Sequence, residues 1–447
     1  MAADQSETDL IQEMEKITSA LGSKLTGLPS PGSFRGWSIY KVPKRLRKLN
    51  EEAYTPKLVS IGPVHHGQPH LNSMERYKLE YCKKFLDITL VSLKEVIKRA
   101  IECEAAVRSQ YQDTVEFSRK EFVEMIALDG LFIIMLFLKE MFRRTFDSND
   151  VIFVDNWMLR ELFHDTMLLE NQLPSFFLDY LLKMVPQELR NTTFSELTRH
   201  YFMNVGNADR VAIDEPKRHL VEYLQTFHLT MPKEDLVEYF QTFHGMSPIS
   251  LDREVYRKKI FEYTRSATEL HAAGIQFRSS PDPCILKIEF TEYGELIIPQ
   301  LKVNEWTETL FRNLIAFEQC DHQPEYISSY IIFLDCLINT PMDVDLLVEC
   351  GIIENSLGDS ERVSNLFNNL YKETFTEYSI FYYTDIGRKL NAYNKDYWHR
   401  WRAARYRWNV ILKRDYFSNP WSGISVIAAI ILLILTVVQT VCSILGL

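Results

Sequence analysis

Two adjacent histidines, His65 and His66, are the side chains whose type best suits metal or catalytic chemistry. No H-x-x-x-H spacing, C-x-x-C pair or acidic cluster accompanies them, so no complete set of metal ligands is visible. Neighbouring imidazoles on an irregular segment are also poorly placed to bind one ion together. We therefore favour a structural role, in which one imidazole forms a hydrogen bond within the surrounding Gly/Pro segment and the other faces outward. No metal or other cofactor is expected.

A second cluster places a carboxylate beside two amides at Glu170, Asn171 and Gln172, shortly before Pro174. Such groups could position a substrate. They could also pair with the carbonyl groups left free where one helix ends and the next begins, and Asn tolerates the left-handed backbone of such a corner. Because buried polar groups require partners inside the protein, the structural role is favoured.

Common catalytic motifs are absent from the sequence, which contains no G-x-S-x-G, H-E-x-x-H, G-x-G-x-x-G or P-loop pattern. An enzyme of unrecognised type, such as a hydrolase acting near a membrane, stays open as the alternative, because residues from distant segments can meet without leaving a motif. That alternative requires His65, His66 and Glu170 to converge in one pocket.

The overall composition is that of a globular protein. The chain has 447 residues, a net charge of −10, 46% hydrophobic and 25% charged residues, which excludes a disordered chain, a collagen-like repeat and a disulfide scaffold. Its acidity argues against a nucleic-acid partner. The seven cysteines are odd in number and far apart, which predicts buried, reduced thiols in a cytosolic protein.

The C-terminal end has a different character from the rest. Residues 421–447 contain no charged side chain, and residues 424–445 are dominated by Ile, Leu, Val and Ala, including Ile424, Ile431, Leu435 and Leu445. As a helix these 22 residues would be about 33 Å long, against a hydrocarbon core of about 30 Å. We therefore predict a transmembrane helix that begins near Trp421. The alternative, a buried core helix, usually keeps a polar face.

Basic and aromatic residues precede this stretch and predict contact with lipid headgroups. They are Trp398, Arg400, Trp401, Arg402, Arg405, Tyr406, Arg407, Trp408, Lys413, Arg414, Tyr416 and Phe417. The positive charge places the body in the cytosol, so the expected topology is a tail-anchored, single-pass protein whose first partner is the lipid bilayer. The inverted topology would be revealed by a glycan on Asn191, which lies in an N-x-T sequon.

The chain divides into three expected parts: a weakly ordered leader over residues 1–38, one helical body over 39–415, and a juxtamembrane segment with the span over 416–447. Within the leader, Leu10, Ile11, Met14, Ile17 and Leu21 have the spacing of a short amphipathic helix. The many Pro and Gly residues between 39 and 70 predict irregular structure there.

Apolar periodicity predicts that most of the body is helical. The expected helices cover residues 71–106, 121–144, 157–170, 174–185, 307–320, 326–337, 344–348 and 363–371. The second of these resembles a membrane span, but Glu124, Asp129 and Lys139 interrupt it, so a buried core helix is favoured. The predicted fold is thus mostly α: a large helical body with a small β-hairpin, plus one C-terminal transmembrane helix.

The predicted hairpin joins residues 286–290 to residues 296–303 through a turn at 292–294, with Pro299 on an edge strand. An internal repeat precedes it: Leu220–His228 and Leu236–His244 differ only at Leu224 and Phe240. Two copies are too few for a solenoid. We interpret them as a tolerated surface insertion, with a variable recognition loop as the functional alternative.

Seven motifs, met in order between Ile39 and the apolar tail, carry a family resemblance. Their residues are Pro43, Tyr54, Pro56, Ser60, Gly62, Pro63, His65, His66, Glu75, Lys78, Glu170, Asn171, Gln172, Pro174, Arg265, Glu269, Leu270, Gly274, Arg312, Asn313, Glu318, Asn419, Pro420 and Trp421. Together they resemble the plant family catalogued as domain of unknown function 247. Among them, the Glu75–Lys78 and Arg265–Glu269 spacings are typical of surface ion pairs on helices.

The resemblance implies a plant protein with a single C-terminal span and no established enzymatic activity. Some grass members of the family are encoded at self-incompatibility loci, which implies recognition or signalling. The repeated LVEY unit departs from the family pattern. Taken together, the sequence predicts a membrane-anchored, non-enzymatic component that recognises an unidentified protein, with no oligomeric state indicated.

Overall fold

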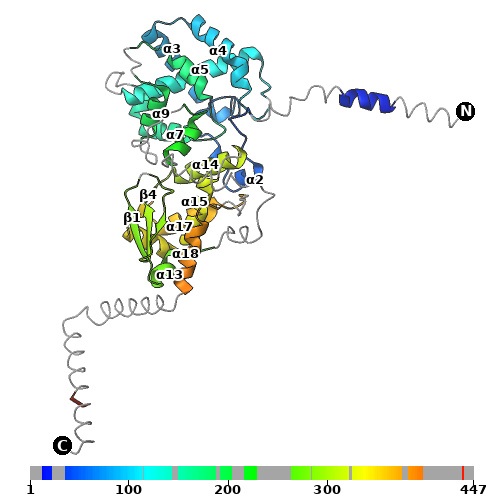
Figure 1. The fold of residues 1–447 in the computed structure, drawn as a ribbon. Helices are drawn as coiled ribbons and strands as arrows, with labels where there is room; N and C mark the ends of the chain where they lie inside the picture. The colour runs from blue at the N-terminus through cyan, green and yellow to red at the C-terminus, as the bar shows by residue number, and fades with distance from the viewer. Residues whose placement is uncertain are drawn as a thin grey trace, which may run out of the picture.

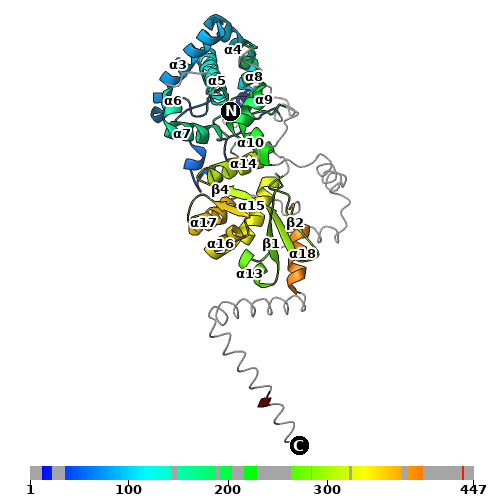
Figure 2. The same ribbon diagram turned by 90° about the vertical axis from the view of Figure 1, so that its left-hand side faces the viewer.

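The computed structural model describes residues 13–22, 36–113, 115–142, 150–187, 192–203, 216–228, 263–282, 284–321, 325–374, 381–395 and 435–436. Figure 1 shows two lobes in contact: an all-helical lobe formed by the first half of the chain, and a second lobe in which helices surround small sheets. Helix α14 (Thr307–Asp321) lies where the two lobes meet, and both views agree on this placement (Figure 2).

The first lobe begins with a mostly irregular segment, as the Pro and Gly residues predict. It contains only the short helix α2 (Lys44–Arg47) and the 3₁₀ turns η2 (Glu52–Tyr54) and η3 (Pro69–Leu71). Helices α3 (Ser73–Thr89) and α4 (Leu93–Arg108) follow. The single helix predicted over 71–106 is therefore wrong: Leu90 adopts φ 55°, and Ser92 starts a new helix by accepting a hydrogen bond from the Glu95 backbone N–H.

Helix α5 (Arg119–Met141) runs through the centre of this lobe and packs against α3, α4, α8 and α9. It begins with a capping box between Ser118 and Glu121. Its charged residues Asp129 and Lys139 are buried and each has an ion-pair partner. The prediction of a core helix here is confirmed. Among the residues that the model describes, no helix combines the length and the apolar character needed to cross a membrane.

The remaining helices of the first lobe are α6 (Val151–Val154), α7 (Asn156–Thr166), α8 (Ser175–Leu182), α9 (Phe194–Tyr201) and α10 (Leu220–His228). Helix α10 is the first copy of the repeat, and it packs against α9 and α14. Seven of its nine residues are buried, so the predicted surface insertion is wrong for this copy, whose apolar side chains belong to the core. The second copy lies outside the described residues.

The second lobe combines helices with short strands. In chain order its elements are α13 (Ala267–Ala272), β1 (Gln276–Ser280), β2 (Glu289–Phe290), β3 (Glu295–Pro299), β4 (Leu301–Val303), α14, α15 (Tyr326–Leu337), α16 (Pro341–Glu349), β5 (Ile353–Asn355), α17 (Ser360–Leu370) and α18 (Thr384–Lys395). The four helices predicted between residues 307 and 371 are all present. The described fold is mostly helical with small sheets.

The predicted hairpin forms only in part. Strands β2 and β3 pair antiparallel, but β1 pairs parallel with the other side of β3, in the register Gln276↔Glu295. Strand β3 is therefore central, and the prediction that Pro299 lies on an edge strand is wrong; Pro299 ends β3 instead. The chain then changes sheets, because β4 pairs parallel with β5. Strands β1 and β5 were not predicted.

Several predictions fall on other parts of the chain. Of the candidate span, only Leu435 and Thr436 are among the described residues. The basic and aromatic residues before the span and the sequon residue Asn191 lie outside them. Six cysteines are described and all are free: Cys82, Cys284 and Cys336 are buried, whereas Cys103, Cys320 and Cys350 are half-buried.

Candidate functional site

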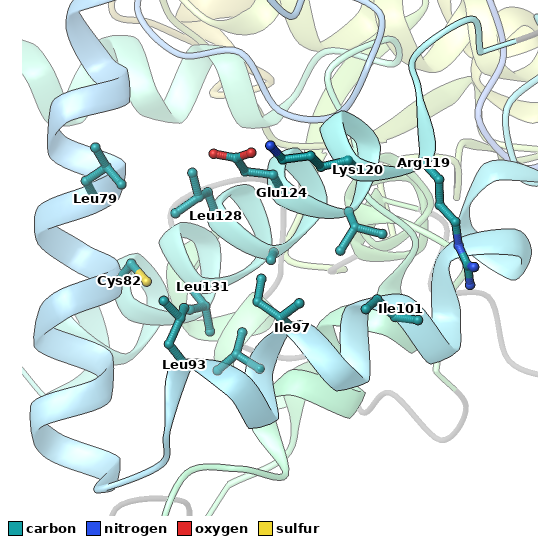
Figure 3. Close-up of a pocket in the computed structure, with 13 residues that line it drawn as sticks. Leu79, Cys82, Leu93, Ile97, Ile101, Arg119, Lys120, Glu124, Leu128 and Leu131 are labelled. Carbon is teal, nitrogen blue, oxygen red and sulfur yellow. The ribbon is translucent and has the colours of Figure 1, made fainter.

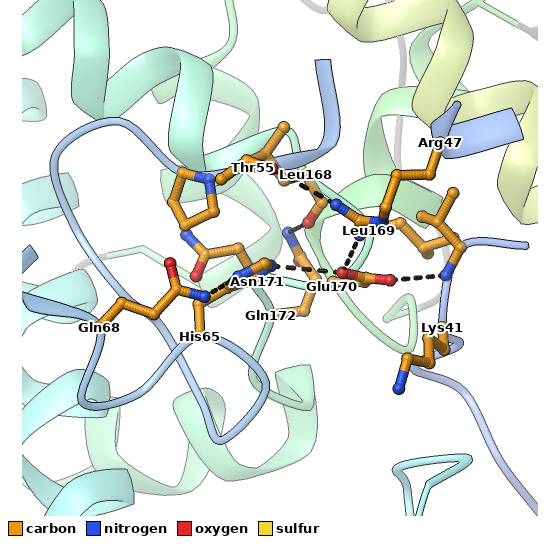
Figure 4. Close-up of polar contacts among 12 residues, drawn as sticks. Lys41, Arg47, Thr55, His65, Gln68, Leu168, Leu169, Glu170, Asn171 and Gln172 are labelled. Carbon is orange, nitrogen blue, oxygen red and sulfur yellow. Dashed lines mark hydrogen bonds and ion pairs between the residues drawn. The ribbon is translucent and has the colours of Figure 1, made fainter. Parts of the chain in front are cut away.

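The central motif forms the corner between α7 and α8, and this corner holds the irregular N-terminal segment in place (Figure 4). The corner starts at Asp165, which is fully buried. Its carboxylate accepts hydrogen bonds from the backbone N–H groups of Lys57, Leu58 and Val59, at 2.8, 2.7 and 2.8 Å. One side chain thus replaces the strand or helix partner that three consecutive N–H groups would otherwise need.

The two amides of the motif complete this corner. Asn171 accepts from the Ile61 N–H at 2.7 Å and donates to the Val59 and Asp165 carbonyls, both at 3.0 Å. Gln172 donates to the carbonyls of Thr166 at 3.0 Å and Leu168 at 2.7 Å, and accepts from the Leu220 N–H at 3.0 Å. The predicted structural role of the amides, pairing with carbonyls at the end of one helix, is confirmed.

Glu170 points the other way, toward the segment that contains α2. Its Oε1 accepts from the Val42 N–H at 2.7 Å, and its Oε2 forms an ion pair with Arg47 and lies 3.3 Å from His65 Nε2. Burial opposes the charge, but His65, Arg47 and the Val42 N–H outweigh it and lower the pKa of Glu170. The carboxylate is therefore ionised, and its donors come from the protein itself.

The two histidines diverge, but the expectation that the second imidazole faces outward is wrong, since His66 is half-buried. His65 is buried, and Figure 4 shows its ring directed at Glu170. The Gln68 amide lies 3.0 Å from His65 Nδ1; with the amide donating, the ring proton sits on Nε2, facing the carboxylate. His66 packs edge-on against the Phe117 ring, at 5.5 Å between centroids. The structure thus joins His65 to Glu170 but directs His66 elsewhere.

Both ring nitrogens of His65 thus face polar groups of the protein, Gln68 and Glu170. No group of three or more His, Cys, Asp or Glu side chains in the described part of the chain is arranged to hold a metal ion. The large cavities described below are lined by other residues.

Lys78, another motif residue, is the centre of a second buried polar cluster. Its Nζ lies 2.6 Å from Asp129 Oδ1 and 2.6 Å from Glu75 Oε1, and it donates to the Ser60 carbonyl at 2.7 Å. The predicted pair of Glu75 and Lys78 forms, but its placement at the surface is wrong for Lys78, whose side chain is 0% exposed. The missing information was Asp129, a partner far away in sequence. Arg265 and Glu269, by contrast, are both exposed.

Gly62 lies between these two clusters and could hardly be another residue. Its N–H donates to Asp129 Oδ2 at 2.8 Å, and its φ is 74°. A Cβ at this position would lie 2.6 Å from the Gln172 carbonyl oxygen and 2.8 Å from the Tyr111 hydroxyl. The motif glycine is thus required both by its positive φ and by the close approach of the two chain segments.

The later motifs connect the second lobe to this corner. Asn313 on α14 accepts from the Leu169 N–H at 2.9 Å and donates to the Ala53 carbonyl at 2.7 Å. Glu318, also on α14, accepts from the N–H groups of Ile327 and Ser328 at 2.8 and 2.9 Å. Burial raises the pKa of Glu318 to about 7, although these donors favour the ionised form.

The remaining described motif residues are buried, turn the chain or form an ion pair. Tyr54, Pro56, Ser60, Pro63, Pro174 and Leu270 are buried, Pro43 is half-buried, Gly274 has φ 97°, and Arg312 pairs with Glu308 at 2.8 Å. Asn419, Pro420 and Trp421 lie outside the described residues. The sequence analysis did not identify the buried acids Asp129 and Asp165 as partners of the motifs. The groups that they bind lie about 50 to 110 residues away in sequence.

An apolar groove lies on the surface of the first lobe (Figure 3). It has a volume of about 650 Å³ and lies between α3, α4 and the first half of α5. Leu79, Leu93 and Ile101 remain 57%, 53% and 43% exposed there, and Arg119, Lys120 and Glu124 supply charge. The other lining residues are Cys82, Val96, Ile97, Val123, Ala127, Leu128 and Leu131. The apolar spacing over these residues predicted only a helix and gave no indication of a groove.

A second large cavity lies near α8 and α9 and is more polar. It has a volume of about 770 Å³, and its lining includes Ser175, Asp179, Lys183, Lys217 and Arg218.

Fold and site together define a mostly helical protein whose motif residues form an internal polar network that joins distant segments. A family model described as plant protein of unknown function matches residues 39–435, and the chain belongs to this family, domain of unknown function 247. The predicted resemblance is confirmed.

Two Arabidopsis thaliana proteins are similar over most of their length. UPF0481 protein At3g47200 is 29% identical, covering 91% of this chain and 86% of its own. Putative UPF0481 protein At3g02645 is 22% identical, covering 90% and 89%. No solved structure matches the chain.

Proposed function

We propose that the protein is a membrane-anchored component that recognises another protein and has no catalytic role. The observation that carries the proposal is the uncharged stretch over residues 424–445, preceded by basic and aromatic side chains. A helix of this length would match the hydrocarbon core, and the positive charge before it supports a cytosolic body.

The polar motif residues support a non-enzymatic role. Glu170, Asn171 and Gln172 spend their hydrogen-bonding capacity on backbone groups, Arg47 and His65. A catalytic carboxylate or amide needs an open position for substrate, whereas these side chains join segments of the protein to each other. The enzyme alternative, a hydrolase acting near a membrane, keeps only the contact between His65 and Glu170, because His66 packs against Phe117 and does not join them.

Membrane attachment is tested by fractionating cells that express the full-length protein. Deletion of Trp421–Leu447 should release the body from carbonate-washed membranes. Ile431→Arg should disfavour insertion by roughly 2.5–3.5 kcal/mol, whereas the matched Ile431→Leu should insert normally. If Ile431→Arg integrates as well as the natural sequence, the proposed span is wrong. A glycan on Asn191 would show that the topology is inverted, with the body outside the cytosol.

Recognition is tested by proximity labelling in plant cells. The labelling enzyme is fused to the intact protein, and the matched control is the same enzyme fused to residues 416–447 alone. We expect specific proteins to be labelled only when the body is present. Identical labelling by both fusions contradicts recognition by the body. Turnover of a small substrate by the purified protein, lost on His65→Gln, would instead favour the enzyme.

A further inference from the structure

The leader contains a helix whose apolar face is uncovered. Residues 13–22 are helical, and Met14, Ile17 and Leu21 are 61%, 59% and 56% exposed. Their spacing of three and four residues places all three on one face. In Figure 1 this dark blue helix stands clear of both lobes. A ten-residue helix is only marginally stable alone in water, so its apolar face requires a surface to pack against.

The groove between α3, α4 and α5 has the dimensions of such a surface. On α4, Leu93, Ile97 and Ile101 recur every four residues along its floor. They cover about 12 Å of helix axis, and Met14 to Leu21 covers about 10.5 Å. Two apolar stripes of similar length therefore remain uncovered on the same chain, one on the leader helix and one in the groove.

The charges of the two partners are complementary. Residues 1–22 contain five acidic side chains and a single lysine. Arg119 and Lys120, at the start of α5, are exposed beside the groove, and Figure 3 shows both at its margin. Two carboxylates lie close to these cations: Glu124 lines the groove, and Glu104 Oε2 lies 3.7 Å from Arg119 Nε. The acidic leader, of which helix 13–22 contributes two of the five acids together with the lysine, is thus attracted to this end of the groove.

The connection between the two elements is long enough. Residue 38 is fixed beside the end of α4, because the Ser38 N–H donates to the Gln110 carbonyl at 3.0 Å. Gln110 is nine residues beyond Ile101, which is about 14 Å along a helix axis. The thirteen residues 23–35 can span up to about 45 Å when extended. Helix 13–22 can therefore reach the full length of the groove.

We propose that helix 13–22 docks into the groove between α3, α4 and α5 of the same chain, with Met14, Ile17 and Leu21 packed against α4. Attachment by a short connection gives an effective concentration on the order of millimolar, so a weak intrinsic affinity suffices. The docked helix covers Leu79, Leu93 and Ile101. The proposal is independent of membrane anchoring, so either can fail without the other.

Disulfide trapping in the purified full-length protein tests the contact directly. The double variant Ile17→Cys, Leu93→Cys is equilibrated in a glutathione redox buffer and mapped by peptide mass spectrometry. The matched control is Ser19→Cys, Leu93→Cys, because residue 19 lies about 200° around the helix from residue 17. We expect at least a fivefold higher yield of the intramolecular disulfide for the first pair. Equal yields overturn the proposal, and a disulfide between two chains assigns the groove to a second copy instead.

Hydrogen exchange provides a second measurement that needs no new cysteine. In the natural full-length protein we expect the amides of residues 13–22 to exchange at least tenfold more slowly than in the Leu93→Glu variant. The matched control is Val154→Glu, at a residue that is 61% exposed on α6 and does not line the groove; it should leave the exchange unchanged. Fast exchange in the natural protein, or the same exchange in all three, overturns the proposal.

Discussion

Lys78 Nζ and Asp129 Oδ1 meet at 2.6 Å inside the first lobe, where the side-chain exposures are 0% and 1%. The pair connects α3 to α5, and each member also binds the irregular segment, Lys78 through the Ser60 carbonyl and Asp129 through the Gly62 N–H. Burial opposes the charge on Lys78, but Asp129 and Glu75 outweigh it and raise the pKa of Lys78. A buried ammonium thus organises two helices and a loop.

Removing the ammonium should be strongly destabilising. Lys78→Met leaves the Asp129 carboxylate buried without its cation, and we expect the free energy of unfolding to fall by about 3–5 kcal/mol in urea titrations. Asp129→Asn should lower the free energy of unfolding less in the Lys78→Met protein than in the natural one. In that variant the amide replaces a carboxylate that has no cation, and its oxygen still accepts from Gly62. Strictly additive effects would contradict the coupling of the two side chains.

The motif glycine gives a matched pair of substitutions. Gly62 and Gly67 have similar φ values, 74° and 80°, but a Cβ at Gly67 would meet nothing within 4 Å. Gly67→Ala should therefore lower the free energy of unfolding by roughly 1–2 kcal/mol, the cost of holding an alanine in the left-handed conformation. Gly62→Ala adds the collision with the Gln172 carbonyl and should cost clearly more. Equal melting temperatures for the two variants would disprove the close approach.

The amide of Asn171 should be irreplaceable by a carboxylate. In Asn171→Asp the two carbonyls of Val59 and Asp165 lose their donor and face a buried negative charge. We expect a loss of more than about 3 kcal/mol in the free energy of unfolding. Asn365→Asp on the exposed side of α17 is the control and should change stability by less than about 0.5 kcal/mol. A small effect at Asn171 would contradict the described hydrogen bonds.

Glu318 should make stability depend on pH. Its pKa is about 7 in the folded protein, against 4.5 for the ordinary group. The folded state then binds more protons than the unfolded state between these values, so this contribution decreases as pH rises from about 4.5 to 7, by about 3 kcal/mol in total. Glu318→Gln cannot titrate, and the difference between the two proteins should show this slope.

A constant difference between the natural protein and Glu318→Gln across pH 4.5 to 7 would refute the raised pKa. The comparison is necessary because His219 acts in the opposite direction: burial lowers its pKa to about 4. The unfolded state then binds more protons than the folded state, so the His219 contribution grows as pH rises from about 4 to 6.5. Both proteins share this contribution, and it cancels in the difference.

Local signals in the sequence predicted α5, α7, α8 and α14 to α17, but not α9 or α18. The apolar spacing on α14 to α17 and the charged interruptions of α5 are properties of a few neighbouring residues, and these elements were predicted. The break at Leu90 was missed because the apolar spacing continues across it, although Ser92 and Glu95 carry a capping signal. Strands β1 and β5 were missed because each needs a partner that is not its neighbour in sequence. Strand β1 pairs with β3, and β5 pairs with β4, from which α14, α15 and α16 separate it along the chain.

The same distinction applies to the site. The role of Asn171 and Gln172 was predictable, since both pair with carbonyls four to six residues earlier in the chain. The burial of Lys78 was not, because Asp129 is 51 residues away and only the packing of α3 on α5 brings it close. The contact of His65 with Glu170 likewise depends on tertiary structure alone.

The buried face of α10 has a consequence for the duplicated sequence. Leu224 is fully enclosed there, and its counterpart in the second copy is Phe240. A ring forced into a space shaped for leucine typically costs about 1–3 kcal/mol. The two nine-residue copies are otherwise identical, so this single side chain disfavours the second copy at the buried site that α10 occupies.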